Sequence, residues 1–128
     1  MRFLLDTHAV IWFISGDRQF SEKARTVLSA RDAGMFLSIA SIWEMAIKVG
    51  LGKLQLRLGL ESELRRFLEE NGFELLPIEY AHAARVASLP FKHRDPFDRL
   101  LVAQAMIENM TIVSHDSILD GYGVKRLW

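Results

Sequence analysis

Cysteine is absent from this chain of 128 residues, which excludes disulfides and thiolate metal sites and fits a reducing compartment. An excess of one charge is also absent, because 16 Lys and Arg residues balance 16 Asp and Glu residues. A polyanion would therefore have to be recognised through a local patch. The four histidines lack the spacing of zinc ligands. No apolar run is long enough to span a bilayer or resembles a secretory leader, so we expect a cytoplasmic protein without membrane contact.

Half of the residues are apolar, so a chain of this length can bury one core without disulfides. Short apolar runs alternate with helical patterns throughout, and no repeat, low-complexity tract or linker divides them. Strands that are apolar along their whole length are typical of a parallel sheet covered on both faces. The sequence therefore predicts one α/β domain over residues 1–128, with about five parallel strands flanked by helices on both faces.

The expected strands cover residues 2–6, 35–38, 73–78, 110–114 and 124–128. The expected helices cover residues 21–31, 41–52, 61–72, 79–89 and about 95–108, and an apolar run occupies 7–14. Four leucines alternate with other residues from Leu54 to Leu60. This period of two indicates an extended segment, part of which can be a surface loop.

Acidic residues stand next to several expected strands. Asp6 ends the first strand, and Asp116 follows the fourth by two residues. Glu44 falls near the start of the helix after the second strand, and Asp98 near the start of the helix before the fourth. Ligands of open parallel sheets bind outside the carboxyl ends of the strands. We therefore expect these acids at one rim, which Asp98 joins if its helix starts there.

Helix capping offers a structural explanation for some of the same acids. Ser41 and Glu44 have the spacing of a capping box, and Asp95, Pro96 and Asp98 fit the N-cap, N1 and N3 positions of a helix. For Asp95, which directly precedes Pro96, the cap is the favoured role. Taken alone, each of the other acids could have either role.

Four carboxylates in one crevice repel one another, so their assembly is costly unless a cation neutralises them. The donors are carboxylate oxygens, with hydroxyls nearby at Thr7, Ser41 and Ser114 and no thiolate. Such donors favour Mg²⁺ or Mn²⁺ over Zn²⁺. Water bound to such an ion is the nucleophile that phosphodiester hydrolysis requires.

Four segments resemble, in order, the motif blocks of the PIN-domain family, and in particular of VapC-type toxins from bacterial toxin–antitoxin pairs. They read FLLDTHAVIWFISGD, SIASIWEMAIKVGLGKL, RDPFDRLLVAQA and TIVSHDSIL. The resemblance implies a five-stranded parallel sheet with flanking helices. It also implies a metal-dependent endoribonuclease that cuts RNA, often tRNA or rRNA.

The resemblance assigns the catalytic acids to Asp6, Glu44, Asp98 and Asp116. It implies that Asp6, Asp98 and Asp116 bind Mg²⁺, for which Mn²⁺ can substitute. Thr7 matches a hydroxyl that supports the first acid, and Ser114 stands where the family often has Thr or Ser. Candidate RNA-binding residues are Lys48, Arg94 and Arg99, with Lys53 and Lys92 as further basic positions. His8 replaces an Asn of many members, with packing the favoured role and substrate contact the alternative.

Toxins of this family usually form homodimers and are held inactive by an antitoxin. The resemblance implies contact with DNA only through that antitoxin. Trp12, Phe13, Trp43 and Met45 are candidates for an apolar groove that binds the antitoxin, although core packing is favoured for each one. The segment from Leu54 to Leu60 is the preferred candidate for an exposed apolar surface.

Two other functions remain open at this point. A PIN-fold protein could bind or process RNA without being a toxin, or could have lost catalysis, although the presence of all four acids disfavours the loss. A Mg²⁺-dependent phosphatase or phosphotransferase also places an aspartate after its first strand. Those enzymes need a second acid two residues later, where this chain has His8.

Overall fold

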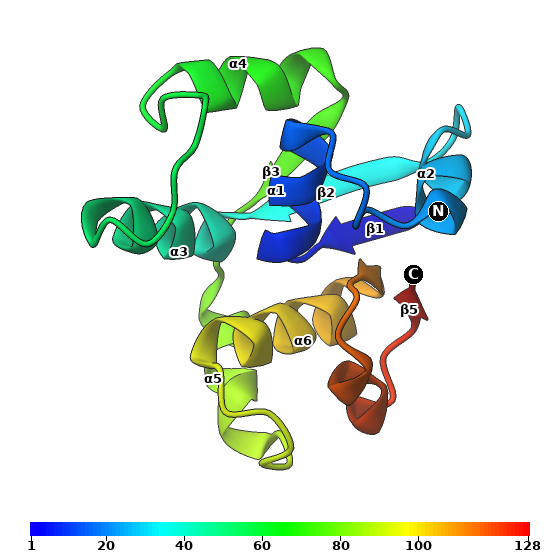
Figure 1. The fold of residues 1–128 in the computed structure, drawn as a ribbon. Coiled ribbons are helices and arrows are strands. Elements are labelled where there is room, and N and C mark those ends of the chain that lie inside the picture. The colour runs from blue at the N-terminus through cyan, green and yellow to red at the C-terminus, as the bar shows by residue number, and fades with distance from the viewer.

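The computed structural model describes residues 1–128 and contains one parallel sheet, with strand order β3-β2-β1-β4-β5 (Figure 1). Its strands are β1 (Arg2–Leu5), β2 (Gly34–Ser38), β3 (Phe73–Leu76), β4 (Thr111–Val113) and β5 (Arg126–Leu127). All neighbouring strands are parallel. The predicted α/β class and five-stranded parallel sheet are therefore confirmed.

Helices connect the strands and cover the sheet. They are α1 (Thr7–Ser15), α2 (Glu22–Leu28), α3 (Ile39–Gly50), α4 (Glu63–Glu70), α5 (Tyr80–Arg85) and α6 (Pro96–Glu108). Two 3₁₀ helices, η1 (Val86–Ser88) and η2 (Ser117–Tyr122), complete the chain. The helix predicted over 79–89 thus changes to a 3₁₀ turn after Arg85. None of these helices has both the length and the apolar composition needed to cross a membrane.

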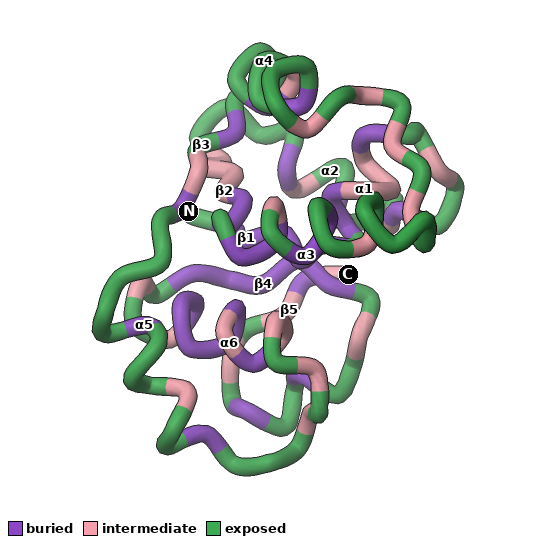
Figure 2. Tube along the Cα trace, turned by 90° about the vertical axis from the view of Figure 1, so that its left-hand side faces the viewer, coloured by how far each residue is buried: buried purple, intermediate pink, exposed green.

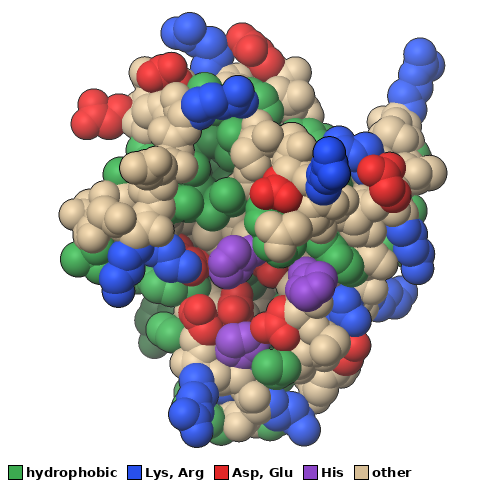
Figure 3. Space-filling model, viewed as in Figure 1, with side chains coloured by type: hydrophobic (Ala, Val, Ile, Leu, Met, Phe, Trp, Pro, Cys, Tyr) green, Lys and Arg blue, Asp and Glu red, His purple; other side chains and the backbone are tan.

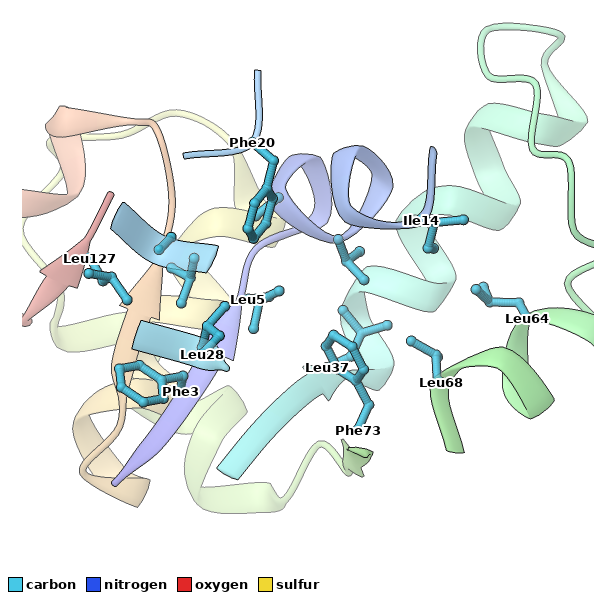
Figure 4. Packing of buried hydrophobic residues seen from close by; sticks show 14 of the residues in the cluster. Phe3, Leu5, Ile14, Phe20, Leu28, Leu37, Leu64, Leu68, Phe73 and Leu127 are labelled. Atoms are coloured by element: carbon cyan, nitrogen blue, oxygen red, sulfur yellow. The ribbon is translucent and has the colours of Figure 1, made fainter. Parts of the chain in front are cut away.

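Successive residues of β1 point to opposite faces of the sheet, as the period of a strand requires. Phe3 and Leu5 belong to a core cluster with residues of α1, α2 and α4 (Figure 4). Leu4 packs in a second cluster with residues of α6 and η2. The central strands β1 and β4 are buried along most of their length (Figure 2). An apolar run without alternation is therefore the correct signature of this sheet, because both of its faces are covered.

The direction in which strands are added to the sheet reverses at β1. From β1 the chain proceeds outward to β2 and β3, and it then returns to the other side of β1 to form β4 and β5. The carboxyl ends of β1 and β4 lie side by side, with Leu5 in register with Val113. The backbone N–H of Asp6 donates to the carbonyl of Val113 at 3.0 Å. This reversal of strand order is where open α/β sheets bind ligands.

The segment from Leu54 to Leu60 forms a loop and joins no strand. Its four alternating leucines are half-buried and pack against the core cluster of α1 and α4. The prediction that this segment is the exposed apolar surface is therefore wrong. The large apolar side chains that are exposed include Trp43 on α3, which is 60% exposed, and Leu51 just after α3, which is 64% exposed.

The four groove candidates differ in their surroundings. Met45 is fully buried in the core. Phe13 is half-buried and packs edge-on against neighbouring phenylalanine rings, and Trp12 is half-buried beside Trp128. Only Trp43 is largely exposed, with its ring edge against Phe97 at a centroid distance of 5.3 Å. Core packing thus accounts for Met45 and most of Phe13, and it leaves Trp43 available to a partner.

Candidate active site

Asp6 stands directly between β1 and α1. Its Oδ1 accepts a hydrogen bond of 2.8 Å from the backbone N–H of Ala9, so the carboxylate caps α1 while it lies at the end of the central strand. The side chain is buried. Burial raises the pKa of Asp6, the Ser114 hydroxyl and the Ala9 amide lower it, and the charge of Asp116 raises it further. An ionised Asp6 therefore gains from any cation placed beside it.

Glu44 lies in the second turn of α3, one turn later than the sequence predicted. The helix begins at Ile39 because the Ser38 hydroxyl caps it, accepting from the backbone N–H of Ala40 at 3.0 Å. Ser41 consequently lies inside the helix, and a capping box of Ser41 with Glu44 is not formed. Both side chains are buried and make tertiary contacts instead.

The contacts of Glu44 come from a lysine on its own helix and a threonine on α1. The Thr7 hydroxyl donates to Oε1 at 2.6 Å and lies 3.0 Å from the Ser41 hydroxyl. The Lys48 ammonium lies 2.7 Å from Oε2. Thr7 was expected to support the first acid, Asp6, but its hydroxyl contacts the second acid. Each oxygen of Glu44 has a donor, which is how a buried carboxylate is tolerated.

Asp95 and Asp98 have different roles at the start of α6. Asp95 is the N-cap, and its Oδ1 accepts from the backbone N–H of Phe97 at 2.8 Å and of Asp98 at 3.4 Å. Pro96 follows as the first helical residue, where its missing N–H costs nothing. The side chain of Asp98 takes no part in the cap and is mostly buried, at 20% exposed. The predicted N-cap role of Asp95 is therefore confirmed, and a catalytic role of Asp98 stays a prediction.

Asp98 is the strongest sign that the acids converge. Its pKa is raised to about 7, mainly by burial and further by the charges of Asp95, Asp6 and Glu44, against a lowering effect of His93. Carboxylates at the start of α1, on α3 and on α6 thus act on one another at this rim of the sheet. Their mutual repulsion makes the site costly to ionise without a cation.

Asp116 closes the site from the β4 side. Its Oδ1 accepts from the backbone N–H of Ile118 at 3.0 Å and caps η2, and its own N–H donates to the Ser114 hydroxyl at 3.0 Å. The side chain is 34% exposed, which is the most open position among the acids of the cluster. In the space-filling view, acidic atoms gather in one patch flanked by histidine atoms (Figure 3). The four predicted acids are therefore brought together at one rim of the sheet.

His93 also belongs to this cluster, although it was not predicted from the sequence. Its Nε2 lies 2.7 Å from Oδ2 of Asp116 and 3.2 Å from Oδ2 of Asp98. A search for zinc-type spacing could not find it, because Asp116 is 23 residues away in the chain. The available signal was its place just before the acid-rich start of α6.

The donors of the cluster fit a hard divalent cation. Carboxylate oxygens dominate, two of the aspartates are held by backbone amides, and His93, Asp98 and Asp116 have ligand atoms within 4.8 Å of one another. Such oxygen-rich sites suit Mg²⁺ and Mn²⁺. Asp6, Asp98 and Asp116 would hold the ion. Glu44 is less available, because its charge is already paired with the Lys48 ammonium at 2.7 Å.

The candidate RNA-binding residues do not behave alike. Arg99 is only 9% exposed, and its guanidinium donates to backbone carbonyls at Pro90 (2.9 Å) and Val86 (3.3 Å). The prediction that Arg99 binds substrate is therefore wrong, because its donors are used inside the protein. Lys48 is half-exposed but paired with Glu44. Arg94, which lies between His93 and Asp95 in the chain, is exposed, and so are Lys53 and Lys92.

His8 lies on the surface at the edge of the site. Its ring is exposed and rests against Trp12 at a centroid distance of 5.9 Å, and His115 contacts the same tryptophan at 6.1 Å. The expected packing role of His8 is thus accompanied by exposure to solvent, which keeps substrate contact open.

Comparisons with known proteins agree with this fold. A family model described as PIN domain matches residues 3–125. Chains of two DNA-bound toxin–antitoxin complexes superpose on nearly the whole protein. The VapBC2 complex from Rickettsia felis gives 17% identity, a TM-score of 0.73 and coverage of 99% of this chain and 98% of that chain. The VapBC complex from Salmonella typhimurium gives 18% identity, a TM-score of 0.67 and coverage of 99% and 97%.

The PIN domain endonuclease Utp24 is a more distant match, with 17% identity, a TM-score of 0.52 and coverage of 93% of this chain and 74% of that chain. No curated protein gives a significant sequence match. At identities of 17% and 18%, the solved structures show only that the fold is shared. The match to the family model is a match of the sequence itself, and it covers nearly all of the chain.

Proposed function

This chain belongs to the PIN-domain family, and we propose that it is a metal-dependent endoribonuclease that acts as the toxin of a VapC-type toxin–antitoxin pair in the cytoplasm. The observation that carries the proposal is the convergence of Asp6, Glu44, Asp98 and Asp116 at the reversal of strand order. The description of Utp24 as a PIN domain endonuclease supports the reaction class. The proposed substrate is RNA, with tRNA or rRNA as the expected targets, and the proposed ion is Mg²⁺ or Mn²⁺.

Each acid has a separate part in the proposed hydrolysis. Asp6, Asp98 and Asp116 would hold the cation, and a bound cation would supply an activated water and neutralise charge on the phosphate oxygens. Asp116 is the most exposed of the three, which supports a role for it in orienting the attacking water. Glu44 adds negative charge from the side of α3 and keeps Lys48 next to the site. In the reaction, the water oxygen bonds to phosphorus, one phosphorus–oxygen ester bond breaks, and the leaving oxygen takes up a proton.

A cognate antitoxin is the proposed protein partner, and a homodimer is the expected assembly. The solved VapBC complexes, which contain chains of this fold and are bound to DNA, support the partner by analogy. The exposed Trp43 and Leu51 add support from this chain, because large exposed apolar side chains mark interaction surfaces. Contact with DNA is expected only through the antitoxin.

The proposal is tested by incubating the purified protein with RNA in Mg²⁺ or Mn²⁺. Cleavage should stop on addition of a chelator and should be lost in Asp6→Asn. Cleavage that survives in Asp6→Asn would come from a contaminating nuclease and would refute the proposed site. RNA binding without cleavage by the metal-loaded protein would instead indicate a non-catalytic member of the family.

A further inference from the structure

His93 lies between two acids that belong to different elements of the fold. It lies in the loop before α6, and its Nε2 points to Asp98 on α6 and to Asp116 at the start of η2. Asp116 is the nearer partner, at 2.7 Å against 3.2 Å for Asp98. The ring is mostly buried, with its side chain 15% exposed. The histidine therefore links the two carboxylates that close the site.

The hydrogen bond on the other ring nitrogen decides what Nε2 can do. The backbone N–H of Asp95 donates to Nδ1 of His93 at 3.1 Å. Nδ1 must then present its lone pair, and in a neutral ring the proton belongs to Nε2. The Nε2–H group points at carboxylate oxygens, which are acceptors. The Asp95 amide thus fixes His93 as a hydrogen-bond donor toward Asp116.

Several hydrogen bonds hold the loop that carries His93. The buried hydroxyl of Tyr122 accepts from the backbone N–H of His93 at 2.8 Å and of Lys92 at 3.2 Å. Arg99 donates to the same hydroxyl at 3.3 Å and to the Pro90 carbonyl at 2.9 Å. The side chain of Arg99 therefore serves the site from inside the protein, by holding the loop that presents His93.

We infer that His93 is a positioning residue that donates through Nε2–H to Asp116 and fixes the separation of Asp116 from Asp98, and that it is not itself a metal ligand. This inference rests on the proposed function, because it assigns a role at the same site. To bind a cation, Nε2 would have to lose its proton and Nδ1 would have to gain one. The proton on Nδ1 would then face the N–H of Asp95, and the bond that holds the ring would be lost.

The first test measures Mn²⁺ affinity of the full-length protein, without any assay of activity. His93→Ala should weaken Mn²⁺ binding by about tenfold, the lower range for loss of a residue that orients metal ligands. His93→Gln should recover most of the affinity, because its amide N–H can donate from nearly the same place. His115→Ala is the matched control, since His115 is exposed beside Asp116 and contacts aromatic rings, and its affinity should not change.

The second test reads the His93 ring directly by ¹H–¹⁵N NMR of ¹⁵N-labelled protein, before and after addition of Mg²⁺. We expect a proton on Nε2 in both states. Loss of that proton on Mg²⁺ binding would make His93 a ligand and overturn the inference, as would unchanged Mn²⁺ affinity in His93→Ala. The NMR measurement on the unaltered protein decides the matter even if a variant does not fold.

Asp98→Asn separates this inference from the proposed function. If Asp98→Asn binds Mn²⁺ as tightly as the unaltered protein, the proposed metal site is wrong. If Asp98→Asn weakens binding while His93→Ala does not, only the role of His93 is wrong.

Discussion

The hydroxyl of Thr7 donates a hydrogen bond of 2.6 Å to Oε1 of Glu44 and so joins the first turn of α1 to the middle of α3. Both residues are buried, and Lys48 on the other carboxylate oxygen is the remaining partner. The second acid of the site is thus held by a helix that the first acid caps. The first turn of α1 therefore both supports Glu44 and positions Asp6.

Thr7→Val should remove a buried donor from Glu44 while nearly preserving the volume of the side chain. We expect the free energy of unfolding to fall by about 1–3 kcal/mol, the range for a buried acceptor left without its partner. Chemical denaturation measures this change. Thr7→Ser keeps the hydroxyl and should lose much less, so equal losses in the two variants would contradict the role assigned to the hydrogen bond.

Asp98→Asn and Asp95→Ala should separate catalysis from capping at the start of α6. Asp98→Asn removes a proposed metal ligand and should lower RNA cleavage by at least about 100-fold, as loss of an essential charged group commonly does. Its fold should persist, because the side chain of Asp98 makes no capping bond and Asn leaves the backbone N–H in place. Initial rates of RNA cleavage and thermal unfolding of each variant give the comparison.

Asp95→Ala should instead destabilise the protein by about 1 kcal/mol, the usual cost of losing an N-cap. Mn²⁺ should still bind, because Asp95 contributes no proposed ligand. Equal losses of metal binding in Asp98→Asn and Asp95→Ala would overturn the division between the two aspartates.

Arg99→Gln should act on stability, because the buried guanidinium satisfies carbonyls that a shorter side chain cannot reach. A fall of about 2–4 kcal/mol in the free energy of unfolding is expected for loss of such a network. Denaturant titration provides the measurement. If the Arg99→Gln protein is stable but binds RNA more weakly, Arg99 is a substrate-binding residue after all.

Arg94→Ala is the contrasting change, since Arg94 is exposed and directly follows His93 in the chain. Its stability should change by less than about 0.5 kcal/mol, as for most surface substitutions. RNA affinity should fall and become less dependent on salt, because one phosphate contact is lost. Binding titrations with Asp98→Asn as the background protein, at two salt concentrations, would detect this; an unchanged salt dependence would exclude a phosphate contact.

The metal-free protein should become less stable as the pH rises. Asp98 has its pKa raised from 3.8 to about 7, so between these values the folded protein binds a proton that the unfolded chain releases. The free energy of unfolding therefore falls through this window and levels off above it. Asp6, whose pKa is also raised, acts in the same direction.

We expect a loss of about 2–3 kcal/mol from pH 5 to pH 8, because about two units of the raised pKa fall in this range at about 1.4 kcal/mol each. Thermal unfolding in a chelator at the two pH values measures it. Asp98→Asn should flatten the profile, and Mg²⁺ should restore stability at pH 8. A profile of the same slope in Asp98→Asn would place the effect elsewhere.

The sequence predicted most of the sheet because a strand buried on both faces leaves a local mark, an apolar run without alternation. It also identified Asp95 as a cap, since Pro96 fixes the register of the helix start. Helix starts without such a marker were less certain, and α3 begins two residues earlier than predicted because Ser38 caps it. The extended segment after α3 was misjudged because leucines that alternate in a loop can pack inward as well as outward.

The sequence by itself determined that four acids follow or precede strands of a parallel sheet, because strand ends and helix caps are encoded within a few residues. Only the tertiary structure decided which donors meet. Thr7 supports Glu44, and Arg99 holds a loop. His93 contacts Asp116, which lies 23 residues later in the chain, and also Asp98. Such contacts depend on the packing of helices against one sheet edge, and side-chain distances of a few ångströms across that edge leave no periodic signal in the sequence.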